Sequence, residues 1–352
     1  MSKITIVGAG KTGRGFLARL LNGNEITFID KDQALVQKLN EAKKFDVKFF
    51  GNKKPTVTVQ GYVAKTWADV SSIQADVIFV SVGGTNLADV GKELKKYVAC
   101  GQRIIVCENA SSPAKKLFEA IGVESVKIAE STVFCTTIEG GELDINSEWY
   151  PYLQFDAEAL KGNLPELDGI KPVENFGGFL DRKLYTYNSA SCVIAYQGYL
   201  KGYTVYSDAA NDPEILALLD KNYEIINECI CKEYGYGEED QKEFALLSRD
   251  KFTDTTLVDT VARNAREPQR KITKTERIVA PMLLEIKYGK DSSGLEKTLA
   301  AMLLYTPKEE EKWIQILEEK GYEGVLTELA GLDKESEVYA RVLALAKSGK
   351  IL

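Results

Sequence analysis

The sequence predicts an α/β protein in which a doubly wound parallel sheet fills the first half and helices fill the second. Three observations support this prediction. Short apolar runs alternate with stretches of helical spacing through the first half, as in a parallel sheet with helical crossovers. Beyond about residue 179 the strand patterns nearly vanish. A turn-rich stretch at 174–178 separates the two halves. We therefore expect two domains, 1–177 and 178–352, in this chain of 352 residues.

The expected elements of the first half follow from its apolar patterns. The run DVIFVSV is typical of a parallel strand that is buried on both faces. Period-two alternation with glycine and proline breaks at 47–67 predicts inserted hairpin strands. The other expected strands are 4–7, 25–30, 76–82, 103–106 and 126–129, and the expected helices are 14–21, 33–43 and 87–97. In the second half, helical spacing is clearest at 213–234, 295–304, 309–320 and 335–346.

The composition argues against several classes of function. A net charge of -7 disfavours a nucleic-acid surface, which needs a concentrated positive field. No apolar run reaches the ~18 residues of a membrane span. Residues 1–3 lead directly into the first strand, so we expect no signal peptide and a cytoplasmic protein. The six cysteines form no CxxC pair, which favours ordinary reduced thiols.

Histidine is absent from the chain. Acid–base chemistry must therefore use lysine, tyrosine, cysteine, aspartate or glutamate. A zinc site of the usual mixed type loses one of its main ligands, so we expect no metal centre.

A glycine-rich motif directly follows the first strand and opens a helix. Gly8 permits a tight turn, Gly10 lets the backbone approach a pyrophosphate, and Gly13 allows close packing of the helix on the sheet. The helix N-terminus then offers free N–H groups and a positive dipole to phosphates. This arrangement predicts a Rossmann-type dinucleotide site.

The end of the second strand indicates which dinucleotide binds. Asp30 lies about twenty residues beyond the motif, where a carboxylate accepts hydrogen bonds from ribose hydroxyls and repels a 2′-phosphate. This favours NAD over NADP, although the neighbouring Lys31 could meet a 2′-phosphate. The expected cofactor-binding residues are Gly8, Gly10, Lys11, Thr12, Gly13, Arg14, Asp30, Val82 and Gly83.

The segment that begins the helical half contains a candidate acid–base residue. On a helix, Lys183, Asn188 and Ser191 fall within about 100–140° of arc and can line one cleft. A desolvated lysine has a depressed pKa and can exchange a proton with an alcohol near neutral pH. A neighbouring carboxamide N–H can hold the developing alkoxide. The alternative is a solvated lysine beside a capping asparagine.

This segment and three others resemble the polyol-specific long-chain dehydrogenase/reductases over nearly the whole chain. That family carries Lys-x4-Asn-x2-His on the first helix of an all-helical C-terminal domain, whereas this chain has Ser191 at the last position. GAGKTGRGF is similar to the family's GxGxxGRGF, and Cys107-Glu108-Asn109 is similar to its CEN or CDN motif. RNAREPQRK at 263–271 resembles its RxxRDPxRKL.

The resemblance implies roles for several of these residues. Lys183 would be the general acid or base, and Asn109 and Asn188 would form an oxyanion hole. Arg263 and Lys271 would contact substrate oxygens. Two further arginines of the same segment, Arg266 and Arg270, can bind a phosphate or carboxylate of the substrate or remain solvated.

The chain departs from the family pattern on the substrate side. Ser191 replaces histidine, and Phe134 stands near the expected position of an acidic substrate-contacting residue. Asp181, where relatives of one type have glutamate, can tune the proton transfer or lie at the surface. The aromatic residues Trp149, Tyr150 and Tyr152 can roof a cleft or simply pack.

The resemblance implies an NAD-dependent, metal-independent dehydrogenase that interconverts a polyol and the corresponding ketose at a CH–OH group. A hexitol phosphate such as mannitol 1-phosphate is the first substrate to expect. A hexuronate of the fructuronate or tagaturonate type and an unphosphorylated polyol are alternatives. A catalytically silent NAD(H)-binding sensor remains a further possibility, and the oligomeric state stays open.

Overall fold

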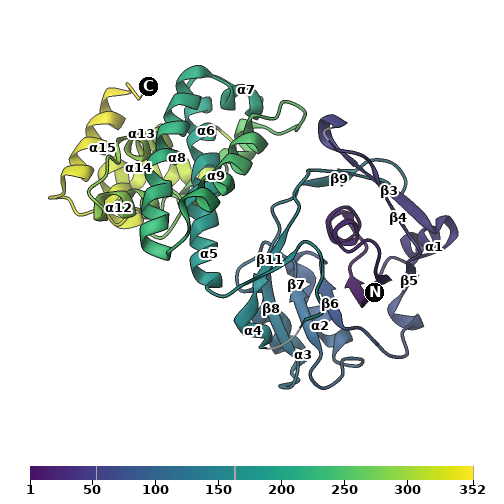
Figure 1. Cartoon of the computed structure of the whole chain (residues 1–352). Coiled ribbons are helices and arrows are strands. Elements are labelled where there is room, and N and C mark those ends of the chain that lie inside the picture. Colours follow the sequence, from purple (N-terminus) through teal and green to yellow (C-terminus); the bar gives the residue numbers. More distant parts are fainter. Residues whose placement is uncertain (53, 162–163, 352) are drawn as a thin grey trace. The chain divides into compact units, whose positions relative to one another are not determined.

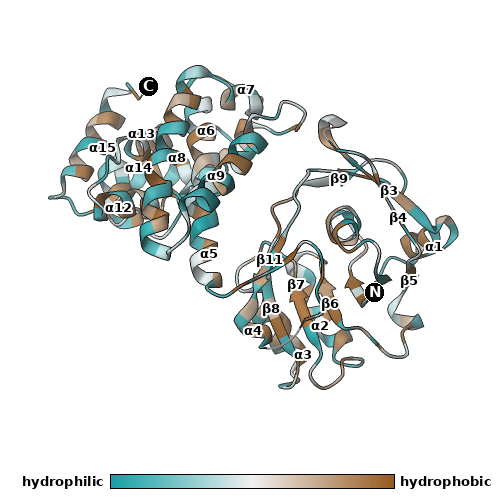
Figure 2. Cartoon of the chain, in the orientation of Figure 1, coloured by the Kyte–Doolittle hydropathy of each residue, from teal (hydrophilic) through white to brown (hydrophobic). Residues whose placement is uncertain are grey.

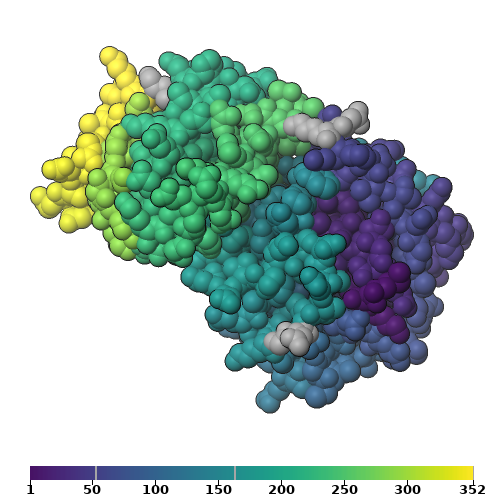
Figure 3. All heavy atoms as spheres, viewed as in Figure 1, coloured from purple at the N-terminus to yellow at the C-terminus, as the bar shows by residue number. Residues whose placement is uncertain are grey.

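The computed structural model describes residues 1–52, 54–161 and 164–351. The chain divides into two compact units, Met1–Phe176 and Gly177–Leu352. In Figures 1 and 3 the first unit runs from purple to teal and the second continues to yellow. The first unit mixes strands and helices, and the described part of the second is helical. The predicted fold class is therefore confirmed.

The main sheet of the first unit has eight strands in the order β12-β11-β8-β7-β6-β1-β2-β5. Its neighbours run parallel, except that β11 runs antiparallel to β8. The chain winds outward from β1 in both directions, so the topological switch lies between β1 and β6. The strands are β1 (Lys3–Val7), β2 (Glu25–Ile29), β5 (Val63–Lys65), β6 (Val77–Val80), β7 (Arg103–Val106), β8 (Lys127–Thr132), β11 (Leu153–Asp156) and β12 (Ile170–Val173).

The centre of this sheet is buried, as the apolar runs predict. Every residue of β6 is buried, and Figure 2 shows β6 and β7 in the brown of apolar residues. Helices α2 (Leu87–Leu94) and α3 (Pro113–Ile121) contact each other and bury apolar side chains in one core with the sheet. Gly91 permits their close approach, because a Cβ there would lie 2.4 Å from the Cβ of Ala120.

A second sheet has four strands in the order β4-β3-β10-β9. The expected hairpin is present in β3 and β4, which pair antiparallel. The third strand of that region, β5, instead joins the main sheet parallel to β2. The pattern of 47–67 did not indicate that β3 would also pair in parallel with β10, about 100 residues later. The strands are β3 (Lys44–Phe49), β4 (Val57–Gln60), β9 (Thr137–Glu139) and β10 (Ile145–Ser147).

The remaining helices of the first unit are short. The first of them, η1, is π-helical and follows the glycine motif. They are η1 (Gly13–Ala18), α1 (Gln33–Ala42) and α4 (Ala157–Leu160), with 3₁₀ turns at Phe50–Asn52, Trp67–Asp69 and Gly84–Asn86.

The second unit is a bundle of helices around a common core. Most are α-helices, and two segments, η5 and η6, are π-helical. The helices are α5 (Phe176–Lys183), η5 (Leu184–Asn188), α6 (Ser189–Leu200), α7 (Tyr206–Ala210), α8 (Pro213–Tyr234), α9 (Glu238–Thr253), α10 (Val261–Ala265), α11 (Pro268–Lys271), α12 (Val279–Lys287), α13 (Ser293–Leu303), α14 (Glu311–Gly324), η6 (Val325–Leu329) and α15 (Glu337–Ser348).

Local sequence explains where the longest of these helices begins and ends. Pro213 occupies the first turn of α8, and the side chain of Asp212 accepts hydrogen bonds from the N–H groups of Glu214 and Ile215. Gly235 ends the helix with a φ of 76°, a conformation that favours glycine.

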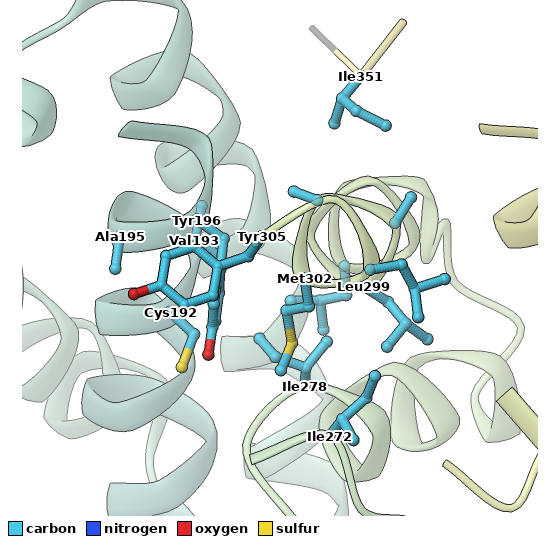
Figure 4. Packing of buried hydrophobic residues seen from close by; sticks show 14 of the residues in the cluster. Cys192, Val193, Ala195, Tyr196, Ile272, Ile278, Leu299, Met302, Tyr305 and Ile351 are labelled. Atoms are coloured by element: carbon cyan, nitrogen blue, oxygen red, sulfur yellow. The ribbon is translucent and has the colours of Figure 1, made fainter. Parts of the chain in front are cut away.

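Helix α6 is the centre of the second unit. It is apolar on all faces, and most of its residues are buried. Figure 4 shows Tyr196 of this helix beside Tyr305, with Leu299 and Met302 of α13 in the same cluster. The two tyrosine rings pack edge to face with centroids 5.2 Å apart. Helix α15 lies at the surface, in the yellow region of Figure 3.

Within the described ranges, no helix combines the length and apolar character needed to cross a membrane.

Candidate active site

A cavity of about 510 Å³ lies at the carboxyl ends of the central strands of the first unit. Open parallel sheets bind ligands at this edge. Seven of the expected cofactor-binding residues line it, together with Asn109. The lining comprises Val7, Gly8, Gly10, Lys11, Thr12, Ile29, Asp30, Lys31, Trp67, Ser81, Val82, Gly83, Asn86, Val90, Cys107, Glu108, Asn109, Val133 and Cys135.

The glycine motif uses its three glycines in different ways. Gly8 has a φ of 100°, and a Cβ there would lie 1.9 Å from the carbonyl oxygen of Ser81. A Cβ on Gly13 would lie 2.0 Å from the carbonyl oxygen of Gly8. Gly10 differs from both, because a Cβ there would meet no heavy atom within 4 Å. Gly8 and Gly13 therefore serve close packing, whereas Gly10 faces open space in which a pyrophosphate can approach the backbone.

The carboxylate of Asp30 is held at the edge of the cavity by two backbone groups. Its Oδ2 accepts the N–H of Ala9 at 2.7 Å, and its Oδ1 accepts the N–H of Asp32 at 2.9 Å. A carboxylate has about four lone-pair sites, so both oxygens retain capacity to accept from ribose hydroxyls. Lys31 also lines the cavity.

Glu108 is a cavity residue to which sequence reasoning assigned no role. Its Oε1 accepts the N–H groups of Val82 at 2.5 Å and Gly83 at 2.7 Å. Burial raises the pKa of this carboxyl group. Glu108 thus fixes the turn after β6. The only feature of the sequence that could have indicated this role is its position in the Cys-Glu-Asn motif at 107–109.

Arg14 was expected to bind the cofactor, and the structure places it elsewhere. It is absent from the cavity lining and is only 2% exposed. Its guanidinium donates to the carbonyl oxygen of Leu143 at 2.7 Å and to Glu139 Oε2 at 3.2 Å. The side chain therefore anchors η1 to the segment that carries β9 and β10. Sequence could not show this, because those partners lie about 125 residues away.

Asn109 lies on the cavity wall, and its side-chain amide bonds to the backbone of Val133. Its Nδ2 donates to the carbonyl oxygen of Val133 at 2.9 Å, and its Oδ1 accepts the N–H of Val133 at 3.3 Å. The next residue, Phe134, is buried and stacks on Tyr150 with ring centroids 4.9 Å apart. Phe134 thus fills an apolar position beside Tyr150, whereas Trp149 and Tyr152 are exposed.

In the second unit, Lys183 and Asn188 stand at the two ends of one π-helical turn. Lys183 is the last residue of α5, and the turn runs over Leu184–Asn188. Its widened hydrogen bonding is seen in the N–H of Ser189, which donates to the carbonyl oxygen of Leu184. In a π-helix the hydrogen bonds join residues five positions apart, so two such residues lie about one turn apart. In an α-helix the second residue would lie about 140° around the axis from the first. The turn therefore brings the two side chains closer to one face than an α-helix would.

Lys183 has the altered basicity that proton transfer requires. Burial lowers its pKa to about 8, and the positive charges of Lys251 and Arg277 act in the same direction. Neither cation was indicated by the sequence, because Lys251 and Arg277 lie far along the chain from Lys183.

The two residues that precede Lys183 attach this segment to neighbouring helices. Arg182 Nε donates to Gln241 Oε1 at 2.7 Å, and its guanidinium packs 4.2 Å from the ring centroids of Tyr236 and Phe244. Asp181 accepts a hydrogen bond from the hydroxyl of Tyr234 at 2.9 Å. Asp181 therefore has a structural partner on α8.

Two of the expected substrate-contacting residues meet at a third residue, Asn264. Ser191 Oγ donates to Asn264 Oδ1 at 3.3 Å, and Lys271 Nζ donates to the carbonyl oxygen of Asn264 at 2.6 Å. Lys271 is only 4% exposed, and burial lowers its pKa to about 8. Asn264 lies within the motif RNAREPQRK at 263–271, but the sequence indicated no role for it.

The arginines of the same segment are more exposed. Arg263 forms an ion pair with Asp259 at 3.1 Å, and Arg270 pairs with Glu267 and Glu276 at 3.1 and 3.2 Å. Arg266 is also exposed. The structure therefore separates a buried lysine, Lys271, from arginines at the surface of the unit.

Two known domain families match the chain, one in each unit. Residues 4–150 match "Ketopantoate reductase PanE/ApbA", and residues 175–342 match "Mannitol dehydrogenase C-terminal domain". A mannitol-1-phosphate 5-dehydrogenase of Caldanaerobacter subterraneus subsp. tengcongensis is 28% identical over 375 aligned positions, which cover 97% of each chain.

Two solved structures have the same fold along almost the whole chain. A D-sorbitol dehydrogenase in substrate-free form has a TM-score of 0.74 at 14% identity, covering 98% of this chain and 92% of that one. A Pseudomonas fluorescens mannitol 2-dehydrogenase, in a ternary complex with NAD and D-mannitol, has a TM-score of 0.62 at 12% identity, covering 98% and 94%. Together with the sequence matches, they confirm the predicted resemblance to polyol dehydrogenases.

The contrast between Gly10 and Gly13 predicts different outcomes for two matched substitutions. Gly10→Ala should leave the thermal unfolding temperature near that of the wild type, because a Cβ there meets nothing. It should weaken NADH binding by about tenfold or more, because the methyl group occupies the approach to the pyrophosphate. Gly13→Ala should destabilise the protein by about 1–3 kcal/mol. Thermal melts and NADH fluorescence titrations measure both effects, and wild-type NADH affinity in Gly10→Ala would contradict the assignment.

The carboxylate of Asp30 predicts the cofactor preference. Asp30→Asn keeps one of the two acceptors that bond to backbone N–H groups and removes the charge that repels a 2′-phosphate. We expect the ratio of NADPH to NADH affinity to rise by about tenfold or more. Titration of both cofactors checks this. The control is the exposed residue Lys92, because Lys92→Ala should leave the affinity for both cofactors unchanged. An unaltered ratio in Asp30→Asn would be the contrary result.

Proposed function

We propose that this chain interconverts a hexitol phosphate, such as mannitol 1-phosphate, and the corresponding ketose phosphate, with NAD as cofactor and Lys183 as general acid and base. The observation that carries the proposal is the π-helical turn, with Lys183 at one end, Asn188 at the other, and a lysine pKa of about 8. The chain is thus an NAD-dependent oxidoreductase of the polyol dehydrogenase type, which acts on a CH–OH group.

The cavity of the first unit suits NAD. A pyrophosphate can approach the open backbone at Gly10, and the fixed carboxylate of Asp30 can bind ribose hydroxyls. Glu108 holds the turn at Val82 and Gly83 in place. We assign the first unit to the cofactor and the second to the acid–base chemistry. NAD, when bound, supplies the acceptor or donor of hydride.

The residues of the second unit supply the proton transfer. In the direction of alcohol oxidation, neutral Lys183 Nζ accepts the proton of the substrate hydroxyl. In ketone reduction, protonated Lys183 returns it to the alkoxide. A pKa of about 8 leaves both protonation states populated near neutral pH, which suits a group that works in both directions.

Two amides are proposed to stabilise the developing alkoxide. Asn188 shares the π-turn with Lys183, and Asn109 is fixed on the wall of the cofactor cavity by its bonds to Val133. Amide N–H groups that are held in advance stabilise an oxyanion without reorganisation. A lysine with an oxyanion hole provides the polarisation for which other alcohol dehydrogenases use a metal ion.

Positive charge around Lys183 favours an anionic substrate. Arg277 lowers the pKa of both Lys183 and Lys271, and Lys251 lowers that of Lys183. Arg277 is also paired with Glu276 at 3.0 Å. Such a cluster of cations matches a phosphate, or a carboxylate in the case of a hexuronate, better than a neutral polyol. We therefore place the phosphorylated hexitol first and the hexuronate second.

Replacement of Lys183 tests the proton-transfer role. Lys183→Ala should lower kcat by about 10²–10⁴-fold and leave NADH affinity unchanged. In the wild type, the rate of alcohol oxidation should rise with pH through about 8, because the base must be neutral, while ketone reduction falls over the same range. Steady-state kinetics with and without a chelator measure these effects. Lys242→Ala is the surface control, and near-normal turnover in Lys183→Ala would exclude the role.

A substrate screen combined with Arg277→Leu tests the choice of substrate. Purified protein with NADH is assayed against ketose phosphates, keto-uronates and unphosphorylated ketoses. We expect ketose phosphates to be reduced fastest, and Arg277→Leu to raise their KM by about tenfold or more without a similar change for neutral ketoses. Fastest reduction of a keto-uronate would move the assignment to that class. NADH binding without reduction of any compound would favour the sensor.

A further inference from the structure

A small cavity of the second unit lies directly against the π-helical turn. Its volume is about 10 Å³. One side is formed by Tyr185 and Thr186 of the turn and by Ser189 just beyond it. The other side includes Asn222 of α8 and Glu285 of α12. The cavity contains no part of the cofactor site described above.

Two polar atoms that lie around this cavity have no hydrogen-bond partner. They are Oε1 of Glu285 and Nδ2 of Asn222. Glu285 is 1% exposed and Asn222 is 7% exposed, and these two atoms themselves are buried. Buried polar atoms in native proteins nearly always have a partner, either a protein group or an ordered water.

The carboxyl group of Glu285 is neutral at physiological pH. Burial raises its pKa to about 9, and the negative charges of Asp291 and Glu296 add to this effect. Lys221 acts in the opposite direction but is paired with Asp291 at 2.6 Å, while Glu296 is paired with Arg341 at 2.8 Å. A protonated carboxyl group is both a donor and an acceptor, so it can bond to a water molecule in either sense.

The volume of the cavity matches one water molecule, for which about 10–15 Å³ of such space is needed. Water inside proteins bonds to two to four polar groups, and here an amide and a neutral carboxyl group flank it. Inserted water is also a recognised cause of a break in the regular hydrogen bonding of a helix. The π-turn is also held by Gln241, whose Nε2 donates to Thr186 Oγ1 at 3.2 Å.

We propose that Glu285 and Asn222 are positioning residues, which together hold one buried water against the π-helical turn and so keep Lys183 and Asn188 on a common face. Without this polar support the turn can relax toward α-helical bonding, which would rotate Asn188 away from Lys183. The proposal rests on the function proposed for Lys183, and it adds a device that selects the π form of the turn.

Matched variants of Glu285 test this idea through activity. Glu285→Gln keeps a neutral donor and acceptor, and should retain kcat within about twofold and the wild-type pH profile. Glu285→Leu is of similar size but removes both polar atoms. It should lower kcat by about tenfold or more, with NADH affinity unchanged and the apparent pKa near 8 displaced. Wild-type kcat and pH profile in folded Glu285→Leu, or equal losses in both variants, would overturn the proposal.

Hydrogen exchange tests the same idea without a substrate. Peptides that span 184–190 should exchange at least about tenfold faster in Glu285→Leu than in Glu285→Gln, whereas peptides of α15 should not differ. If Glu285→Leu fails to fold, Asn222→Ala replaces it in both measurements with the same expectation. Unchanged exchange at 184–190 would refute the positioning role. Altered exchange in a protein that reduces no compound would leave the role standing and remove the proposed function.

The pH dependence of stability provides a readout of the neutral carboxyl group. The folded-state pKa of Glu285 exceeds its unfolded value, so the wild type loses stability relative to Glu285→Gln as pH rises from about 4.5 to about 9. The ratio of their unfolding equilibrium constants should change by about tenfold per pH unit in that range. Urea denaturation at several pH values measures it. Parallel curves for the two proteins would show that the carboxyl group is ionised and would overturn the proposal.

Discussion

The chemistry proposed for this chain depends on a single irregular helical turn. The hydrogen bond from the N–H of Ser189 to the carbonyl oxygen of Leu184 makes the segment π-helical between α5 and α6. Without it, the five-residue spacing of Lys183 and Asn188 would set their side chains about 140° apart around an α-helix. Gln241 of α9 restrains the turn through its bonds to Arg182 and Thr186, and Glu285 of α12 lines the cavity that lies against the turn. The proposed acid–base turn is thus packed against other helices of the second unit.

Burial adjusts the charges of the second unit in a chain that has no histidine. Desolvation lowers the pKa of Lys183 and Lys271 to about 8 and raises that of Glu285 to about 9. Three groups that normally titrate far from neutrality are thereby moved close to it. The cost of burying them is offset differently in each case. Lys271 donates to a backbone carbonyl, Lys183 lies in a cluster suited to an anion, and Glu285 remains protonated.

The first unit reaches its function through backbone geometry. At Gly8 and Gly13 a Cβ would lie about 2 Å from a backbone oxygen, so only glycine fits there. At Gly10 a Cβ would meet no heavy atom within 4 Å. Asp30 and Glu108 use their carboxylates mainly on backbone N–H groups, so they shape the turns that surround the cavity before any ligand arrives. Arg14 serves the same end from outside the cavity, by tying the helix after the motif to the second sheet.

The sequence by itself determined the fold class, the main strands and helices, the glycine motif and the spacing of Lys183 and Asn188. These features depend on periodicity and on residues close together in the chain, where local sterics and hydrogen bonding decide the outcome. The tertiary structure alone decided that β3 pairs with β10, that Arg14 is a structural residue, and that Arg277 and Glu285 lie near the π-turn. Such contacts join residues up to about 130 positions apart, and no local pattern encodes them. They arise only when packing removes charged and polar groups from water and forces each to find a partner.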